Sequence, residues 1–167
     1  MSKRIRMCLR LKDTSYTYPK SFVLVDEISL EALAEAMLDS YMGSVDYEGE
    51  TLDETLVELE NVISGDYGEF LSEASFVIID NEEVQACILI CLYRGEPTVT
   101  YNFTRKSAQR MGYQTLLIGR SAEILYEKGY HSLYLYVHLE NKGALRLYES
   151  LGFQEVPLTT ITEIFID

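Results

Sequence analysis

Two apolar stretches separated by a short polar turn constrain the fold of this chain more than any other feature. Ser75–Ile79 and Val84–Leu92 are rich in β-branched and apolar residues, and Asp80-Asn81-Glu82-Glu83 lies between them. Two such runs predict a β-hairpin. The longest apolar run, Ala86–Tyr93, is far shorter than the ~18 residues that a membrane-spanning helix needs. We therefore expect the hairpin in the sheet of a soluble globular protein, with no membrane partner.

The segments around this hairpin alternate between strand and helix patterns. Further strands are expected at Ile5–Leu11, Thr98–Thr104 and Leu133–Val137, and one or two more in the tail Phe153–Ile166. Helices are expected at Leu30–Tyr41 behind the cap Ser29, at Leu52–Ile63 behind the capping box of Thr51 and Glu54, at Arg110–Lys128, and at Lys142–Leu151. This order predicts an α/β (α+β) fold in which helices flank a sheet.

Strict alternation assigns side chains to the faces of two strands. Val99, Tyr101 and Phe103 are expected on one face of their strand, with Thr98, Thr100 and Asn102 on the other. Cys87 and Cys91 are expected to share a face of their strand and to lie in the core.

Composition narrows the class of protein. The chain has 167 residues, 47% of them hydrophobic and 25% charged, and no Pro/Gly/Ser-rich linker, so we expect one domain over residues 1–167. Three cysteines without a CxxC pair and two histidines argue against a disulfide framework and against a metal site. The basic N-terminus is not followed by an apolar segment, so we expect no secretory signal and a cytoplasmic location.

Charge is distributed unevenly along the chain. The net charge is −13, which disfavours unspecific binding to nucleic acid or to an anionic membrane. Residues 21–80 carry sixteen acidic residues and no Lys or Arg, whereas residues 1–20 carry six basic residues and one acid. The acidic stretch is interpreted either as a surface that attracts a cationic ligand or as a face that keeps the protein soluble.

One junction has the residues of an anion site. Hydrolase, zinc-protease, P-loop and dinucleotide signatures are absent, and His131 and His138, in or beside a strand, are expected to be packed or surface groups. Thr104–Gln114 joins the end of a strand to the start of a helix, whose free N–H groups attract phosphate. Gly112 allows close approach, and Arg105, Lys106 and Arg110 add positive charge. The alternative is a plain strand–helix loop.

A second motif introduces a family resemblance. Asn141–Phe153 has the pattern N-x-x-A-x-x-L-Y-x-x-L-G-F, about thirty residues after the Q-x-x-G of Gln109–Gly112. This order of motifs resembles the GCN5-related N-acetyltransferase (GNAT) superfamily, over residues ~75–157. The resemblance implies the GNAT fold, a mixed, mostly antiparallel central sheet with helices on both faces. Residues 1–75 would form the acceptor-side strand and two helices, and residues 76–167 the acetyl-CoA-binding core.

The resemblance also implies roles for individual residues. The backbone amides of the family's pyrophosphate loop would cradle the coenzyme A diphosphate; that loop corresponds to Gln109, Arg110, Met111, Gly112, Tyr113 and Gln114. The strand residues Asn102, Phe103 and Thr104 would pair with the pantetheine arm, and one amide there would hold the thioester oxygen. Asn141 would hydrogen-bond the coenzyme arm, and Tyr148 would protonate the leaving thiolate. Gln114 stands where the family prefers glycine or alanine, and Tyr148 is otherwise a tyrosine on a buried helix stripe.

The base that takes the proton of the amine is not evident from the sequence. An amine with a pKa near ~10 must lose a proton before it attacks. Glu96 shares a strand face with Thr98 and Thr100, but at ~3.3 Å per residue it precedes the expected thioester position, so it would act through water. The acidic loop Asp46-Tyr47-Glu48-Gly49-Glu50 is the second candidate, with a solvated loop as its alternative.

These inferences predict an acetyl-CoA-dependent N-acetyltransferase. The acetyl group would pass to a primary amine, of a small molecule or a protein, by direct attack in a ternary complex, and the acidic half of the chain favours a cationic acceptor. Transfer of a longer acyl chain or to another atom stays open, as does a homodimer. The alternative is a non-catalytic GNAT-like module that binds coenzyme A or a basic partner.

Overall fold

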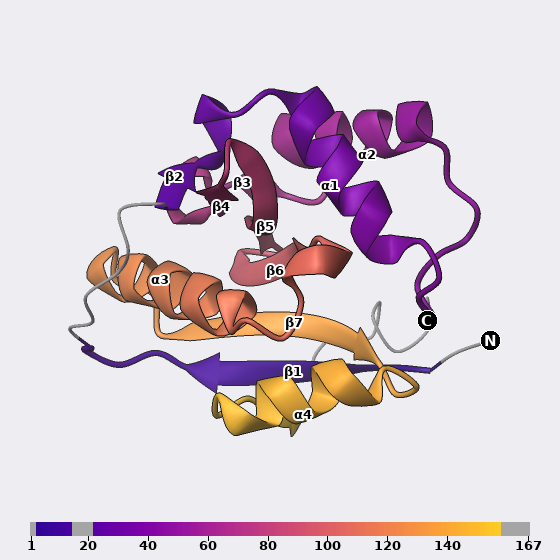
Figure 1. The fold of residues 1–167 in the computed structure, drawn as a ribbon. Coiled ribbons are helices and arrows are strands. Elements are labelled where there is room, and N and C mark those ends of the chain that lie inside the picture. The colour runs from indigo at the N-terminus through magenta and orange to yellow at the C-terminus, as the bar shows by residue number, and fades with distance from the viewer. Residues whose placement is uncertain (1–2, 15–21, 158–167) are drawn as a thin grey trace.

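A mixed sheet with α-helices against both faces forms the part of the chain that the computed structural model describes, residues 3–14 and 22–157 (Figure 1). The strands are β1 (Arg4–Arg10), β2 (Phe22–Leu24), β3 (Glu69–Phe70), β4 (Phe76–Asp80), β5 (Glu83–Tyr93), β6 (Glu96–Thr104), β7 (Ser132–His138) and β8 (Gln154–Val156). The α-helices are α1 (Leu30–Tyr41), α2 (Leu52–Ser64), α3 (Tyr113–Glu127) and α4 (Lys142–Ser150). The expected α/β (α+β) fold, a mixed and mostly antiparallel sheet with helices on both faces, is confirmed.

The strands follow the order β2-β4-β5-β6-β7-β1-β8, and β3 pairs with β5. Neighbouring strands are antiparallel except β6 and β7, which run parallel. The parallel pairing is confined to Thr98 opposite Tyr134 and Val99 opposite Leu135. Beyond Val99, β5 is the one strand of the described residues that still pairs with β6, so β6 and β7 diverge toward their C-terminal ends.

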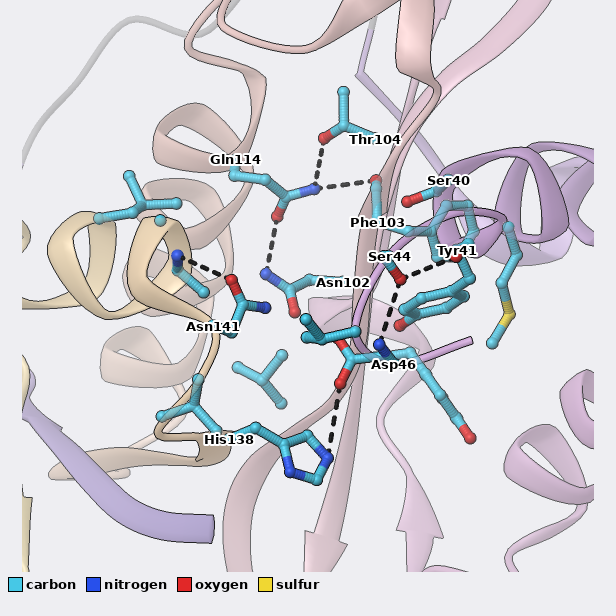
Figure 2. Close-up of a pocket in the computed structure, with 18 of the residues that line it drawn as sticks. Ser40, Tyr41, Ser44, Asp46, Asn102, Phe103, Thr104, Gln114, His138 and Asn141 are labelled. Carbon is cyan, nitrogen blue, oxygen red and sulfur yellow. Dashed lines mark hydrogen bonds and ion pairs between the residues drawn. The ribbon is translucent and has the colours of Figure 1, made fainter. Parts of the chain in front are cut away.

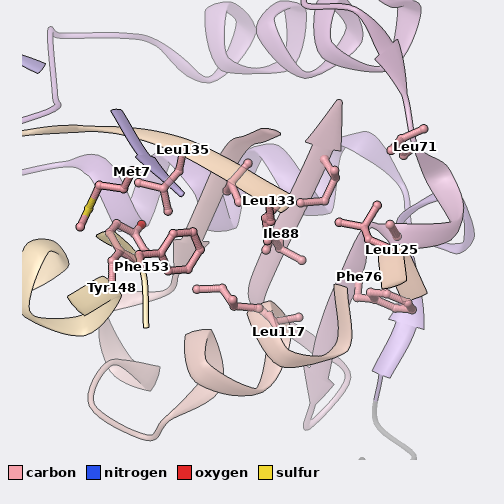
Figure 3. Packing of buried hydrophobic residues seen from close by; sticks show 14 of the residues in the cluster. Met7, Leu71, Phe76, Ile88, Leu117, Leu125, Leu133, Leu135, Tyr148 and Phe153 are labelled. Carbon is pink, nitrogen blue, oxygen red and sulfur yellow. The ribbon is translucent and has the colours of Figure 1, made fainter. Parts of the chain in front are cut away.

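Two apolar clusters lie on opposite faces of the sheet. The first joins the sheet to α3 and α4, through residues such as Leu117, Leu125 and Phe153 (Figure 3). The second joins it to α1 and α2, through residues such as Leu33 and Leu59. The central strand β5 serves both: Ile88 and Ile90 face the first cluster, and Cys87, Leu89 and Cys91 the second. The expected shared, buried face of Cys87 and Cys91 is confirmed.

The predicted hairpin of β4 and β5 is confirmed, with Asn81 and Glu82 in the turn at φ of 52° and 62°. A second tight turn at Arg94 and Gly95, at φ of 54° and 80°, joins β5 to β6. Both turns place two successive residues at positive φ, which suits the twist of a two-residue hairpin. Pro97 does not interrupt the strand; it is buried within β6, opposite Leu92.

The predicted caps of α1 and α2 are also present. The Ser29 hydroxyl accepts a hydrogen bond from the backbone N–H of Ala32 at 3.3 Å. Thr51 and Glu54 form the reciprocal capping box, with distances of 3.1 and 3.0 Å. Such side chains satisfy N–H groups that have no partner within the helix. Both helices therefore begin where the sequence predicted.

Val99 does not share a face of β6 with Tyr101 and Phe103, so this part of the expected alternation was wrong. A bulge at Thr100 shifts the register between Leu89 and Ile90 of β5. Val99 consequently packs in the cluster under α3 and α4, whereas Tyr101 and Phe103 face the cluster under α1 and α2. An extra residue in one strand turns the following side chains to opposite faces.

The two short strands β2 and β3 were not expected from the sequence. Of the strands expected in the tail, β8 lies within the described residues. Residues 158–166 of that tail lie outside them. In residues 3–14 and 22–157, the helices are all too short or too polar to cross a bilayer.

Candidate active site

A cleft of about 830 Å³ opens where β6 and β7 diverge (Figure 2). One wall comes from α1, the loop after it and the start of α2. The floor comes from β6 and the end of β7, and the opposite wall from the start of α3 and from α4. The lining includes Tyr41, Asp46, Glu58, Tyr101, Asn102, Phe103, Thr104, Gln109, Arg110, Gly112, Tyr113, Gln114, His138, Asn141 and Tyr148.

The strand-to-helix junction is a loop with left-handed backbone rather than the start of the expected helix. Arg110 and Gly112 have φ of 67° and 79°, so α3 begins at Tyr113 and not at Arg110. The N–H of Leu116 makes the first helical bond, to the carbonyl of Gly112 at 3.2 Å. The preceding N–H groups have no helical partner and form a positive helix terminus beside the exposed Arg110.

The structure brings one of the three expected cations of this junction to the cleft. Arg110 lines it, but Arg105 and Lys106 do not. The Arg105 Nε donates to the carbonyl of Val84 at 2.9 Å, and the backbone N–H of Lys106 donates to the Asp39 carboxylate at 2.8 Å. Both residues thus bind the loop to neighbouring elements, Arg105 to β5 and Lys106 to α1.

A hydrogen-bonded network joins β6, α3 and α4 inside the cleft. The Gln114 amide donates to the carbonyl of Phe103 and to the Thr104 hydroxyl, both at 2.9 Å. Its oxygen accepts from Asn102 Nδ2 at 3.1 Å, and the same Nδ2 lies 2.8 Å from the Tyr148 hydroxyl. The Tyr148 hydroxyl in turn lies 3.2 Å from Asn102 Oδ1. Gln114 therefore points toward β6 (Figure 2).

Tyr148 is both a core residue and a cleft residue. The residue is 6% exposed, its ring packs against Phe153 with a centroid distance of 5.6 Å, and its hydroxyl contacts Asn102. Burial raises the pKa of Tyr148, which the hydrogen bond from Asn102 partly offsets. The ordinary pKa of a tyrosine is ~10, so the hydroxyl is protonated at neutral pH and can donate a proton.

Asn141 has a structural task that leaves part of its amide for a ligand. Its Oδ1 accepts from the N–H of Ala144 at 3.2 Å and caps α4. Its Nδ2 makes no hydrogen bond with the described residues, and the residue lines the cleft.

Glu96 is not brought together with the other candidate residues. It lies at the N-terminal end of β6, outside the lining of the cleft, and is ion-paired with Arg6. The buried Arg6 guanidinium also lies over the Tyr134 ring, 4.0 Å from its centroid. The Glu96 carboxylate therefore balances a buried cation.

Carboxylates gather on the wall formed by α1, the following loop and α2. The cleft is lined there by Asp46, Glu48, Glu50, Glu54 and Glu58. Glu58 accepts hydrogen bonds from Tyr101 and, at 2.6 Å, from Tyr67. Burial and the hydrogen bond to Glu58 raise the pKa of Tyr67 to about 12. The acidic loop that the sequence singled out thus faces the cleft.

His138, which we expected to be a packed or surface group, lines the cleft. It ends β7, and its Nε2 lies 3.4 Å from Oδ1 of Asp46 (Figure 2). The signal available in the sequence was its place at the end of a strand, directly before the motif at Asn141. Among the described residues, no group of three or more His, Cys, Asp or Glu side chains is arranged to hold a metal ion.

Comparison with known proteins identifies the family. The model of the acetyltransferase (GNAT) family matches residues 31–153, which is most of the chain. The chain belongs to the GNAT acetyltransferase family. No curated protein matches this GNAT chain significantly.

Solved structures show the same GNAT fold. A GCN5-related N-acetyltransferase from Sphaerobacter thermophilus superposes with a TM-score of 0.70 at 16% identity, over 92% of this chain and 48% of that one. The chain thus spans about half the length of that protein. The ribosomal-protein-S18-alanine N-acetyltransferase of Escherichia coli gives 0.65 at 20% identity, over 81% and 78%. An aminoglycoside N-acetyltransferase in complex with CoA gives 0.60 at 14%, over 96% and 94%.

GNAT acetyltransferases use acetyl-CoA, and the cleft offers matching groups. The left-handed loop presents N–H groups and a glycine, Gly112, around which a built Cβ atom meets nothing within 4 Å. Among the described residues, no strand pairs with the edge of β6 beyond Val99 on the β7 side. An extended polar chain can hydrogen-bond there as a strand would.

Proposed function

We propose that this GNAT protein transfers the acetyl group of acetyl-CoA to a primary amine, by direct attack in a ternary complex. One observation carries the proposal: a positive helix terminus, a free strand edge and a buried tyrosine hydroxyl line a single cleft. The helix terminus suits a diphosphate, the strand edge suits an extended arm, and the tyrosine hydroxyl suits a leaving thiolate.

Acetyl-CoA would be held mainly by backbone groups in the donor half of the cleft, which β6, α3 and α4 form. The N–H groups of the loop from Gln109 to Gln114 would bind the diphosphate, with Arg110 beside them. The edge of β6 at Asn102–Thr104 and the free Nδ2 of Asn141 would bind the pantetheine arm. One backbone N–H of this edge would hold the thioester oxygen as negative charge grows on it, a contribution of about 3–4 kcal/mol.

Tyr148 would act as the general acid. Its hydroxyl carries a proton at neutral pH, as a tyrosine with its ordinary pKa of ~10 does, and burial raises this pKa further. Asn102 fixes the direction of the hydroxyl. Proton transfer to the sulfur makes the thiolate a better leaving group.

The acceptor is proposed to be cationic. The wall opposite the donor half carries five carboxylates, listed above, while Arg4 and Arg110 are the Arg or Lys residues in the described lining. A polyamine, an amino sugar, or a lysine or N-terminal amine of a protein would be attracted to such a wall.

Thermal unfolding with acetyl-CoA tests the donor site first. A ligand at ~100 times its Kd adds about 2.7 kcal/mol, which raises Tm by roughly 5–11 °C in a domain of this size. S-acetylpantetheine, which lacks the diphosphate, is the control and should give a smaller shift. Equal shifts, or none with acetyl-CoA at millimolar concentration, would contradict the proposed diphosphate loop.

Release of the CoA thiol with a panel of amines then tests transfer. The panel contains spermidine, an amino sugar and a lysine-containing peptide. We expect amine-dependent thiol release with at least one of them. A Tm shift without release for any amine would instead support a non-catalytic module that binds coenzyme A.

A further inference from the structure

The structure places Asp46 and His138 opposite each other at the acceptor side of the cleft (Figure 2). Asp46 belongs to the loop between α1 and α2, and His138 is the last residue of β7. Asp46 Oδ1 and His138 Nε2 lie 3.4 Å apart, and the two side chains are 29% and 23% exposed. Such contacts are often long in a site without substrate and shorten when it binds.

The surroundings of His138 decide which of its nitrogens carries the proton. Nδ1 is buried and has no hydrogen-bond partner among the described residues. The Asp46 carboxylate only accepts hydrogen bonds, so the neutral ring that can donate to it carries its proton on Nε2. Nε2 is the nitrogen that lies 3.4 Å from Asp46 Oδ1.

Neither ring nitrogen of His138 is open to an acceptor amine. Nε2 faces the Asp46 carboxylate, and Nδ1 is buried. His138 is thus poorly placed to take the proton of the amine, although it is well placed to hold the Asp46 carboxylate.

Asp46 is held in place and lies near the general acid. Its backbone N–H donates to the Ser44 hydroxyl at 3.2 Å, which in turn donates to the carbonyl of Tyr41 at 2.7 Å. Asp46 and Tyr148 both line the cleft, and the Asp46 charge raises the pKa of Tyr148 in addition to burial.

We propose that Asp46 is the proton acceptor for the acceptor amine and that His138 is the positioning residue that holds its carboxylate. This inference rests on the proposed function. It assigns the base to the acidic loop and not to Glu96, which lies outside the cleft lining and is ion-paired with Arg6.

The proton balance of the transfer is as follows. An amine that arrives as an ammonium ion first loses one proton to solvent. Its nitrogen lone pair then attacks the acetyl carbonyl carbon, so that a C–N bond forms and the C–S bond breaks. The remaining excess N–H proton passes to the Asp46 carboxylate, and the Tyr148 hydroxyl gives its proton to the sulfur. Water returns the proton from Asp46 to Tyr148, and no oxidant or reductant is consumed.

Four variants test the assignment by steady-state kinetics with acetyl-CoA and the best amine of the panel. Asp46→Asn should lower kcat by about 100-fold or more, with KM for acetyl-CoA unchanged. His138→Ala should lower kcat by about 10-fold, and His138→Gln, whose amide N–H replaces Nε2–H, should stay within about threefold of wild type. His131→Ala is the control, because that exposed histidine lies outside the cleft lining.

Two kinetic results would overturn the inference. Wild-type kcat in Asp46→Asn would remove Asp46 from the reaction. A His138→Gln variant as slow as His138→Ala would make the imidazole itself the proton acceptor. The acetyl-CoA Tm shift, measured for every variant, shows that a loss of kcat does not come from unfolding.

A spectroscopic readout does not depend on activity. The ¹⁵N shifts of the His138 ring should report a proton on Nε2 and none on Nδ1, and Asp46→Asn should weaken this preference. A ring protonated at Nδ1 would overturn the inference even in an active enzyme. Wild-type protein that releases no CoA thiol with any amine would overturn the proposed function and the role of Asp46 with it, while a wrong result in the variants alone overturns only the inference.

Discussion

At the scale of single residues, Tyr148 separates packing from chemistry, because its ring lies in the core and its hydroxyl in the cleft. Tyr148→Phe keeps the ring contact with Phe153 and removes the hydroxyl. If that hydroxyl protonates the leaving thiolate, kcat should fall by about 10²–10⁴ while the acetyl-CoA Tm shift stays. Thiol release and thermal unfolding measure the two quantities.

Tyr130→Phe is the matched control for this prediction. Tyr130 also packs partly buried against the cluster under α3 and α4, but it does not line the cleft. Its variant should keep wild-type kcat. Equal rates for the Tyr148 and Tyr130 variants would reduce Tyr148 to a core residue.

Gln114 is the residue at which this chain departs from the family pattern, and the structure gives it a local role. Gln114→Ala removes its hydrogen bonds to Asn102, Phe103 and Thr104, so Asn102 no longer holds the Tyr148 hydroxyl in one direction. We expect kcat to fall by about tenfold. Affinity for acetyl-CoA, measured by calorimetry, should be kept or increase because alanine is the residue that the family prefers. Weaker binding of acetyl-CoA would contradict this account.

The sequence singled out more of the residues that line the donor half of the cleft than of those that line the acceptor half. Gln109–Gln114 and Asn141 belong to local motifs with fixed spacing, so a resemblance is enough to select them. Asp46 and His138 lie far apart in the chain and belong to no motif, and only the packing of the α1–α2 loop over the end of β7 brings them together. The sequence around Glu96 does not indicate its ion pair with Arg6, because Arg6 belongs to β1 and lies far away in the chain.

At the scale of elements, Gly68 fixes the short strand β3 against β5. A Cβ atom on Gly68 would lie 2.0 Å from the carbonyl oxygen of Leu92 and 2.7 Å from its carbon, and both are backbone atoms that cannot move aside alone. Gly68 also has φ of 101°. Gly68→Ala should therefore lower the free energy of unfolding by about 3 kcal/mol or more, measured by denaturant titration.

Gly129→Ala separates the close contact from backbone strain. Gly129 has a similar φ of 95°, but a Cβ atom there meets nothing within 4 Å. Strain alone should cost about 1 kcal/mol. Equal losses in the two variants would show that the contact with Leu92 relaxes freely.

The bulge at Thr100 explains why alternation predicted the strand β6 and failed on its faces. The sequence of Thr98–Thr104 alternates without a break, so nothing in it marks the residue that lies outside the pairing. The register is set by the partner strand β5 and by the clusters on both faces. Periodicity thus predicts that a strand exists, but a bulge depends on its neighbours.

At the scale of the whole molecule, the uneven charge predicts a dependence on salt. If the carboxylate wall attracts a cationic acceptor, raising ionic strength from ~0.02 to ~0.3 M should raise KM for spermidine by about tenfold or more, because salt screens the attraction. KM for a neutral amine such as an aniline is the control and should change little. Neutral amines that react as well as spermidine at low salt would contradict a cationic acceptor.

The sequence predicted the fold class well and the cleft only in outline. Caps, turns and apolar periods are local, so most helices and strands could be assigned without coordinates. The cleft depends on where β6 and β7 stop pairing, and the strand sequences do not mark that point. The short strands β2 and β3, of three and two residues, carry too little pattern to be recognised.

β6 and β7 pair at Thr98 and Val99 of β6 and then separate, so little backbone pairing connects the two halves of the sheet at the cleft. A molecule bound in the cleft contacts residues of both halves of the sheet and links them. Its binding would slow amide hydrogen exchange along the edge of β6 and at the end of β7 together, although the two segments are not paired with each other. Occupancy of the cleft would thus be recorded in the solvent protection of the sheet itself.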